Sequence, residues 1–113
     1  MRIGIFCSDK DEIIKLRLFT INKILENKEE IVQIKKPCNC GFDIVTNENQ
    51  YIIRIATENS KGCKLNEVYT YNIKNKRMLD ILYCTLIPLE GENDLCWRFN
   101  SIKDSELKYI KIN

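Results

Sequence analysis

The sequence predicts an α/β fold, with a single domain in which a mixed β-sheet carries two main helices packed on it. Two observations lead to this prediction. Short apolar runs rich in β-branched and aromatic residues alternate with two segments whose apolar residues recur at helical spacing. Their order is strand, helix, several strands, helix and further strands, which is typical of helices packed on a sheet. The 113 residues, 44% of them hydrophobic and 30% charged, suffice for one core, so we expect residues 1–113 to form one domain.

The first two predicted elements are a strand over residues 2–8 (RIGIFCS) and the helix that follows it. The strand is mostly apolar, which is typical of a buried strand. Ser8, with Asp11 three residues later, resembles a capping box at the start of a helix. The helical face that we expect to be buried comprises Ile14, Leu18, Ile21 and Leu25, widened by Ile13, Phe19 and Ile24. Asn27 and the charged residues after it predict the end of this helix.

The middle of the chain predicts a β-hairpin. Residues 30–35 (EIVQIK) form a short strand candidate that we expect to end against Pro37. In the stretch FDIVTNENQYIIRIA that follows, two runs of β-branched and aromatic residues flank a turn at residues 47–49. This pattern predicts two antiparallel strands joined by a slightly long loop.

The stretch SKGCKLNEVYTYN, residues 60–72, predicts a turn at Gly62 followed by a strand. Asn75 is a typical N-cap for a second helix, which we expect to be ended by Pro88. The apolar face of this helix comprises Met78, Leu82 and Leu86, with Leu79, Ile81 and Tyr83 beside it.

Two late strands complete the prediction. They are LCWRF, residues 95–99, and LKYIKI, residues 107–112. Lys108 and Lys111 suit the second of them to an exposed sheet edge, where charged side chains discourage further pairing.

The composition excludes several classes of protein. No run approaches the roughly 20 apolar residues that span a bilayer, and the acidic residues near the start interrupt any signal-peptide core. We therefore expect a cytoplasmic protein without a membrane partner, whose six Cys are reduced. The absence of His excludes His-based catalysis and mixed Cys/His zinc sites. A net charge of +2 is too small to indicate a nucleic-acid partner by itself.

Sequence patterns for catalysis are sparse. The four Gly are solitary, and none is followed by the Lys that completes a phosphate-binding loop. Asp9 and Asp11 follow a strand end, where carboxylates can hold Mg²⁺ in α/β folds. The interpretation that we favour is that these two acids complement the dipole of the helix that they precede. We therefore expect no enzyme, with a metal-dependent hydrolase as the alternative.

The cysteines offer one metal hypothesis. Cys38 and Cys40 share a loop, and with Cys63 and one further Cys they could form a four-thiolate structural zinc site. The alternative is a reduced, solvent-facing pair at 38 and 40 with no cofactor. The remaining cysteines, in apolar runs, are expected to be small core residues: Cys7, Cys84 and Cys96.

Basic and aromatic residues supply candidate binding groups. Basic residues cluster loosely near the second helix, and rings nearby could stack on bases or anchor a protein interface. The binding candidates are Lys61, Lys64, Tyr69, Tyr71, Lys74, Lys76, Arg77 and Trp97, with Tyr51 as a further ring. A plainer interpretation is that the rings are half-buried strand residues and the lysines a solvated rim.

Residues 2–72 resemble part of a phage terminase large-subunit ATPase core, the part that follows its phosphate loop. RIGIFCSDKDEIIKLRLFTINKILEN matches the strand and helix, and a hairpin and KGCKLNEVYTYN follow. Lys61, Gly62 and Lys64 match the family's basic turn, while Asn66 stands where an acid is usual. Val68 and Tyr69 match the strand that follows the turn.

The resemblance breaks down at the catalytic residues. Tyr71 and Asn72 occupy the positions of the family's catalytic acids, and the phosphate loop is missing. Since Tyr and Asn cannot supply the anionic oxygens that a Mg²⁺–triphosphate complex needs, the resemblance implies a pseudo-ATPase fragment from a phage or mobile element.

The function expected from the sequence is that of a non-enzymatic accessory protein. It would bind a host or phage protein, as an inhibitor of a host defence or replication factor. The alternative is a nucleic-acid-binding accessory protein that uses the basic turn and the neighbouring lysines. The oligomeric state does not follow from the sequence.

Overall fold

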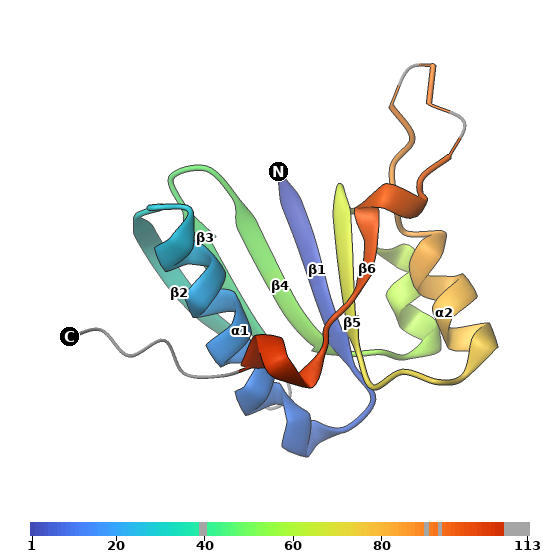
Figure 1. Ribbon diagram of the computed structural model, residues 1–113, viewed down its shortest axis with the longest axis horizontal. Coiled ribbons are helices and arrows are strands. Elements are labelled where there is room, and N and C mark those ends of the chain that lie inside the picture. Colours follow the sequence, from blue (N-terminus) through green and yellow to red (C-terminus); the bar gives the residue numbers. More distant parts are fainter. Residues whose placement is uncertain (39–40, 90, 93, 108–113) are drawn as a thin grey trace.

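The computed structural model describes residues 1–38, 41–89, 91–92 and 94–107, without the side chains of residues 37 and 38. Six strands form one sheet, and two α-helices and four short 3-10 helices accompany it (Figure 1). The strands are β1 (Arg2–Cys7), β2 (Ile31–Cys38), β3 (Gly41–Thr46), β4 (Gln50–Ile55), β5 (Glu67–Tyr71) and β6 (Phe99–Ser101). The helices are η1 (Lys10–Glu12), α1 (Ile13–Glu26), η2 (Glu58–Gly62), α2 (Lys76–Tyr83), η3 (Cys96–Arg98) and η4 (Asp104–Leu107). The predicted α/β fold with a mixed sheet and two main helices is confirmed.

The strand order in the sheet is β2-β3-β4-β1-β5-β6. β1 lies at the centre and pairs in parallel with β4 and β5, and β6 pairs in parallel with β5. β3 runs antiparallel to both of its neighbours. The carboxyl ends of β1, β4, β5 and β6 therefore meet at the same end of the sheet.

The sheet has a core on each face because successive strand residues point in opposite directions. On β1, Ile3, Ile5 and Cys7 belong to the core beneath α1. Phe6 lies on the other face with Leu65 and with Leu82 of α2. The molecule thus has three layers, with α1 on one face and η2 and α2 on the other.

Gly4 of β1 allows the layer that contains η2 and α2 to pack closely against the central strand. A Cβ atom at this position would clash with side-chain atoms of Leu65 and Phe6. Leu65 is fully buried and forms a parallel bridge with Leu86, so it joins the segment before β5 to the segment after α2. A residue without a side chain at position 4 is therefore needed for this packing.

The prediction for the first helix was right in position and wrong in its start, and its buried face was predicted in part, since Ile13, Phe19 and Ile24 are buried as expected. Asp9, not Ser8, caps the first turn, because its carboxylate accepts a hydrogen bond from the Asp11 backbone N–H. The buried residues of α1 are Ile13, Leu16, Phe19, Thr20 and Ile24. Ile14 and Leu25, which we expected in the core, are exposed. Apolar residues surround much of this helix, so spacing alone did not identify the stripe that faces the sheet.

The predicted hairpin is confirmed as β3 and β4, which pair antiparallel across the turn at residues 47–49. β2, in contrast, continues past Pro37, where we expected it to end. It lies at the edge of the sheet, where a residue without an N–H is tolerated.

The second helix begins as predicted, since the Asn75 side chain accepts a hydrogen bond from the Met78 backbone N–H. It ends at Tyr83, earlier than the expected stop at Pro88, and Leu86 packs into the core from beyond its end. Residues 95–99 do not form the expected strand, because Cys96–Arg98 is a 3-10 helix and only Phe99 enters β6. Of the predicted strand 107–112, Leu107 lies in η4, and Lys108 and Lys111 fall outside the described residues.

No helix in the described part of the chain is long and apolar enough to cross a bilayer.

Candidate functional site

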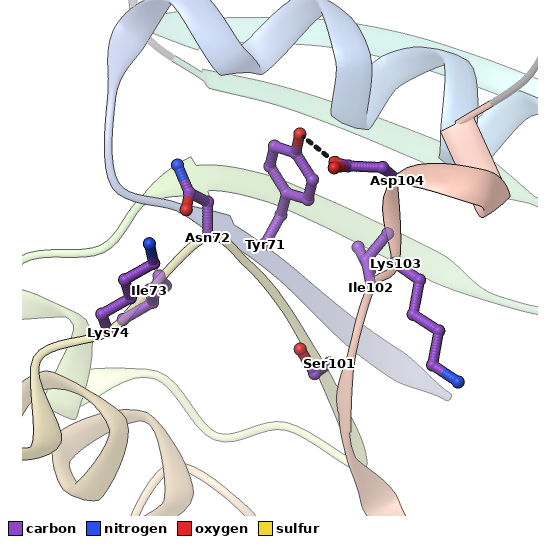
Figure 2. A pocket seen from close by; sticks show the side chains of 8 residues that line it. All are labelled: Tyr71, Asn72, Ile73, Lys74, Ser101, Ile102, Lys103 and Asp104. Carbon is purple, nitrogen blue, oxygen red and sulfur yellow. Dashed lines mark hydrogen bonds between the residues drawn. The ribbon is translucent and has the colours of Figure 1, made fainter.

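A cleft of about 440 Å³ opens where β5 and β6 diverge at their carboxyl ends (Figure 2). Asn72, in a left-handed conformation with φ of 55°, turns the chain after β5 toward α2. After β6, Ile102 instead enters the core beneath α1. Ligands of open α/β sheets commonly bind where adjacent strands send their chains to opposite faces. The cleft is lined by Tyr71, Asn72, Ile73, Lys74, Ser101, Ile102, Lys103 and Asp104.

The inner wall of the cleft is the buried ring of Tyr71. Its hydroxyl donates a 2.7 Å hydrogen bond to Asp104 Oδ1, which joins the end of β5 to η4 (Figure 2). This bond, assisted by desolvation and by the negative charges of Asp104 and Glu12, raises the pKa of Tyr71. Tyr71 is therefore a neutral hydrogen-bond donor within the fold, and its ring is buried.

The side chain of Asn72 is also used structurally. Its Nδ2 donates to Glu12 Oε2 at 3.0 Å, and Ser8 Oγ donates to Glu12 Oε1 at 2.8 Å. The buried Glu12 carboxylate thus links the ends of β1 and β5. The two positions at which a terminase carries its catalytic acids hold a phenol and an amide here, and both form hydrogen bonds within the fold.

The chemistry available in the cleft is that of polar binding. Its lining offers the ammonium groups of Lys74 and Lys103, the hydroxyl of Ser101, and a carboxylate that already accepts the Tyr71 proton. Among the described residues, no cluster of three or more Cys, Asp or Glu is arranged to hold a metal ion.

Asp9, one of the two alternative metal ligands, caps the first turn of η1, which contains the other, Asp11. Asp9 Oδ1 accepts from the Asp11 backbone N–H at 3.1 Å, which is the geometry of a helix cap. The interpretation of these acids as helix N-terminal groups agrees with this contact.

The described cysteines differ in their exposure to solvent. Cys7 is a buried core residue as predicted, and burial, the largest influence, raises the pKa of its thiol to about 11, so it is unreactive. Cys84 and Cys96 are exposed, contrary to the prediction that they belong to the core. Cys63 is half-buried. The zinc hypothesis also needs Cys38 and Cys40, whose side chains lie outside the described residues.

Several of the predicted basic residues gather around η2 and α2. Lys61 and Arg77 line one hollow of about 350 Å³, and Lys61 and Lys64 line another. Acidic residues are interleaved with them, because Glu58 and Asp80 line the first hollow and Arg77 forms a 2.9 Å ion pair with Glu58. The remaining basic candidates are the exposed Lys74, at the cleft, and Lys76, the first residue of α2.

The aromatic candidates lie elsewhere. Tyr69 packs beneath α1, where its ring lies 5.5 Å from that of Phe19 and 4.8 Å from Lys23 Nζ. Tyr51, the other ring considered, is fully buried. Among these candidates, only Tyr71 and Lys74 line a common site, the cleft; Tyr69 and Tyr51 lie apart from the basic residues around η2 and α2.

Trp97 is the one sequence candidate whose ring is largely exposed, at 63%. It lies in η3, directly before β6. We term the described residues 87–89, 91–92 and 94–97, which lead from α2 to β6, the 87–97 arm; the loop before η3 projects beyond the sheet at the end opposite the cleft (Figure 1). The Trp97 Nε1 donates a 2.8 Å hydrogen bond to Glu92 Oε2.

Sequence reasoning missed the residue that holds this arm, Arg98. Its guanidinium is buried, donates to the carbonyl oxygens of Asn66 and Ile87, and forms an ion pair with Glu92. The hydrogen bond to Arg98, the largest influence, lowers the pKa of Glu92. The only signal in the sequence was a single Arg inside the apolar run LCWRF.

No family model, curated protein or solved structure matches this chain. The terminase resemblance therefore rests on the sequence stretches quoted above.

Proposed function

We propose that this protein acts by binding another protein, without catalysis, and that Trp97 on the 87–97 arm is the main contact residue. The observation that carries the proposal is the large exposure of the Trp97 ring in η3, at the base of the 87–97 arm. Trp is the residue type most enriched among the contacts that dominate protein interfaces. Large exposed apolar side chains also lie on the same arm, at Ile87 and Leu89.

The Trp97 ring is held in place before any partner arrives. Glu92 accepts from the indole Nε1 with one carboxylate oxygen and pairs with Arg98 through the other. Arg98 is in turn bonded to backbone carbonyls at the base of the arm. A side chain that is already fixed loses less conformational entropy on binding, so more of its contact energy appears as affinity.

The biological setting is part of the proposal and rests on the terminase resemblance alone. It is that of a phage or mobile-element accessory protein that inhibits a host defence or replication factor.

Nucleic-acid binding is the second candidate, because Lys61 lies between the hollows that Arg77 and Lys64 line. Such a surface would act through phosphate contacts, whose strength falls steeply with salt. Glu58 and Asp80 in the same hollow oppose an anionic ligand, so we rank this candidate second.

The test is affinity capture with full-length tagged protein from a lysate of a low-GC Gram-positive bacterium, with and without nuclease. The wild type is compared with Trp97→Ala and with Ile14→Ala. Ile14 is a matched control because its exposure, 65%, equals that of Trp97 within a few per cent and it lies on α1, away from the arm.

We expect one stoichiometric protein that survives nuclease, is retained by Ile14→Ala and is lost with Trp97→Ala. Retention of that protein by Trp97→Ala would overturn the role given to the arm. Loss of all bound material with nuclease would instead favour the basic surface, and Lys61→Glu would then be the variant to measure against salt.

A further inference from the structure

Two cysteines that the proposed function does not use, Cys63 and Cys84, border the same hollow. This hollow, of about 350 Å³, is lined by residues 61–64 on one side and by residues 84–88 on the other. Both cysteines are free thiols, and Cys84 is exposed whereas Cys63 is half-buried. The hollow therefore brings together two thiols that are 21 residues apart in the sequence.

The backbone holds the two sides of the hollow next to each other in a parallel arrangement. Leu65 and Leu86 form a parallel bridge, fixed by backbone hydrogen bonds of 2.8 and 2.9 Å. Segments bridged in this way lie about 4.8 Å apart. Each cysteine comes two residues before the leucine of its own segment, so Cys63 and Cys84 stand at matching positions ahead of the bridge.

The neighbouring helices bring the two cysteines to one junction. Cys63 directly follows η2, and Cys84 directly follows α2. Asp80 and Ile81 of α2 line a second hollow together with Cys84 and with residues of η2. Residues three and four apart lie on one side of a helix, so Cys84 continues the side of α2 that faces η2.

A disulfide requires two Cα atoms within about 7 Å of each other and side chains that point toward one another. The bridge and the shared hollow are the observations that favour such a bond here. From this juxtaposition we propose that Cys63 and Cys84 are a reversible oxidation site, at which hydrogen peroxide converts the two thiols into a disulfide. The bond joins the end of η2 to the end of α2, and it does not depend on what the 87–97 arm binds.

The exposed thiol of Cys84 meets the oxidant first. Its sulfur attacks the peroxide, so that an S–O bond forms, the O–O bond breaks and one water leaves with the thiol proton. The sulfur of Cys63 then attacks the sulfenic acid on Cys84, so that the S–S bond forms, the S–O bond breaks and a second water leaves. The two thiols lose two electrons, and the peroxide is reduced to water. A dithiol reverses the reaction by thiol–disulfide exchange.

The test treats the reduced full-length protein with a small excess of hydrogen peroxide and then blocks the remaining thiols with an alkylating agent. Digestion after Glu, without reduction, places Cys63, Cys84 and Cys96 in three different peptides. We expect mass spectrometry to find the Cys63 peptide joined to the Cys84 peptide in monomeric protein, and a dithiol to release both. In urea we expect a mixture of pairings, because the fold supplies the proximity.

Three variants separate the roles of the thiols. In Cys63→Ser, we expect the sulfenic acid to persist on Cys84, where a cyclic 1,3-diketone traps it. In Cys84→Ser, we expect the Cys63 thiol to be lost at least about tenfold more slowly than in the wild type. Cys96→Ser is the matched control, since it removes the other exposed cysteine of the described chain and should leave the yield of disulfide unchanged. Circular dichroism of each variant confirms that it is folded.

Several results would overturn the proposal. One is a wild type in which peroxide leaves Cys63 and Cys84 unlinked, whether or not a sulfenic acid forms. Another is a disulfide that joins Cys84 to Cys96, or that forms only between two copies of the chain. Equal yields in the folded protein and in urea would also overturn it, because the bond would then owe nothing to the fold.

Discussion

Two buried charges, Glu29 in the β2–β4 half of the sheet and Arg98 in the β5–β6 half, are held in different ways. In the β2–β4 half, the Glu29 carboxylate is surrounded by neutral donors that lie close together in the fold. It accepts from Thr46 Oγ1 and from the Tyr51 hydroxyl, both at 2.6 Å, and from Asn49 Nδ2 at 2.9 Å. Burial alone would raise the pKa of Glu29, but these hydrogen bonds, with one from Asn27, together lower it.

In the β5–β6 half, the Arg98 guanidinium connects segments that are distant in the sequence. Its partners are the carbonyls of Asn66, before β5, and Ile87, after α2, together with the carboxylate of Glu92 on the arm. Glu29, in contrast, joins the β3–β4 hairpin to the adjacent segment between α1 and β2, where Asn27 also donates to it. The first charge fixes a local hairpin that β pairing already supports, whereas the second ties the arm to the sheet.

The two arrangements differ in how strongly the fold depends on one side chain. Removing the partners of a buried charge lowers the free energy of unfolding. Removing the charge itself also lowers it, because the partners are then left buried and unpaired. The hairpin has a full strand ladder besides Glu29, but Arg98 joins three segments that no long strand pairing unites. We therefore expect Arg98 to be the more sensitive of the two positions.

The largest effect is expected from Arg98→Met, which keeps the length of the side chain and removes its charge and donors. It removes the donor to the carbonyls of Asn66 and Ile87 and the cation beside Glu92, whose carboxylate keeps only neutral donors. We expect the free energy of unfolding to fall by about 3 kcal/mol, measured by urea denaturation. Arg77→Met is the control, since its ion pair with Glu58 is exposed and its loss should change the free energy by less than about 1 kcal/mol. Equal losses in the two variants would contradict the role of Arg98.

A smaller effect is expected from Glu29→Gln. The amide NH₂ of Gln is a donor, so it meets the hydroxyl and amide groups that now donate to the carboxylate. We expect a loss of about 2 kcal/mol in the free energy of unfolding. Glu26→Gln, at an exposed position on α1, should be close to neutral. A neutral Glu29→Gln would show that the carboxylate charge is not needed.

A smaller effect is expected in how the stability difference between the wild type and Glu29→Gln depends on pH. The pKa of Glu29 is lower in the folded chain than its ordinary value, so the folded state binds this proton less readily than the unfolded state. Its contribution is present above the unfolded pKa, about 4.3, and is lost as the pH falls through the folded pKa. The difference in unfolding free energy between the wild type and Glu29→Gln should therefore shrink below about pH 4. A difference that does not change with pH would contradict the lowered pKa.

These two charges also show what the sequence could and could not predict. The β3–β4 hairpin was predictable because its turn and its two apolar runs are adjacent in the chain. The buried face of α1 was not, since apolar residues occupy several sides of the helix and contact with the sheet selects Leu16 and Ile24 over Ile14 and Leu25.

The candidate sites were likewise predictable only in part, because they depend on contacts that form in the folded chain. Trp97 was identified from its residue type, but Arg98 could not be, because its partners come from segments 32 and 11 residues away along the chain. Tyr71 and Asn72 were considered only as substitutes for catalytic acids. Their structural roles depend on Asp104 and Glu12, which only the folded chain brings near them.

The smallest effect on stability is expected from Trp97→Ala. This variant tests whether the ring serves partner binding or the stability of the fold. The ring is largely exposed, and apart from the hydrogen bond to Glu92 and the nearby guanidinium of Arg98 it contributes little to packing. We expect the free energy of unfolding to change by less than about 0.5 kcal/mol, which is typical of a surface substitution. Since Arg98 still holds Glu92 and the base of the arm, a loss of partner binding in this variant would come from the missing ring alone. A loss of stability comparable to that of Arg98→Met would instead mean that the ring is part of the fold, and the proposal that it anchors a partner would fail.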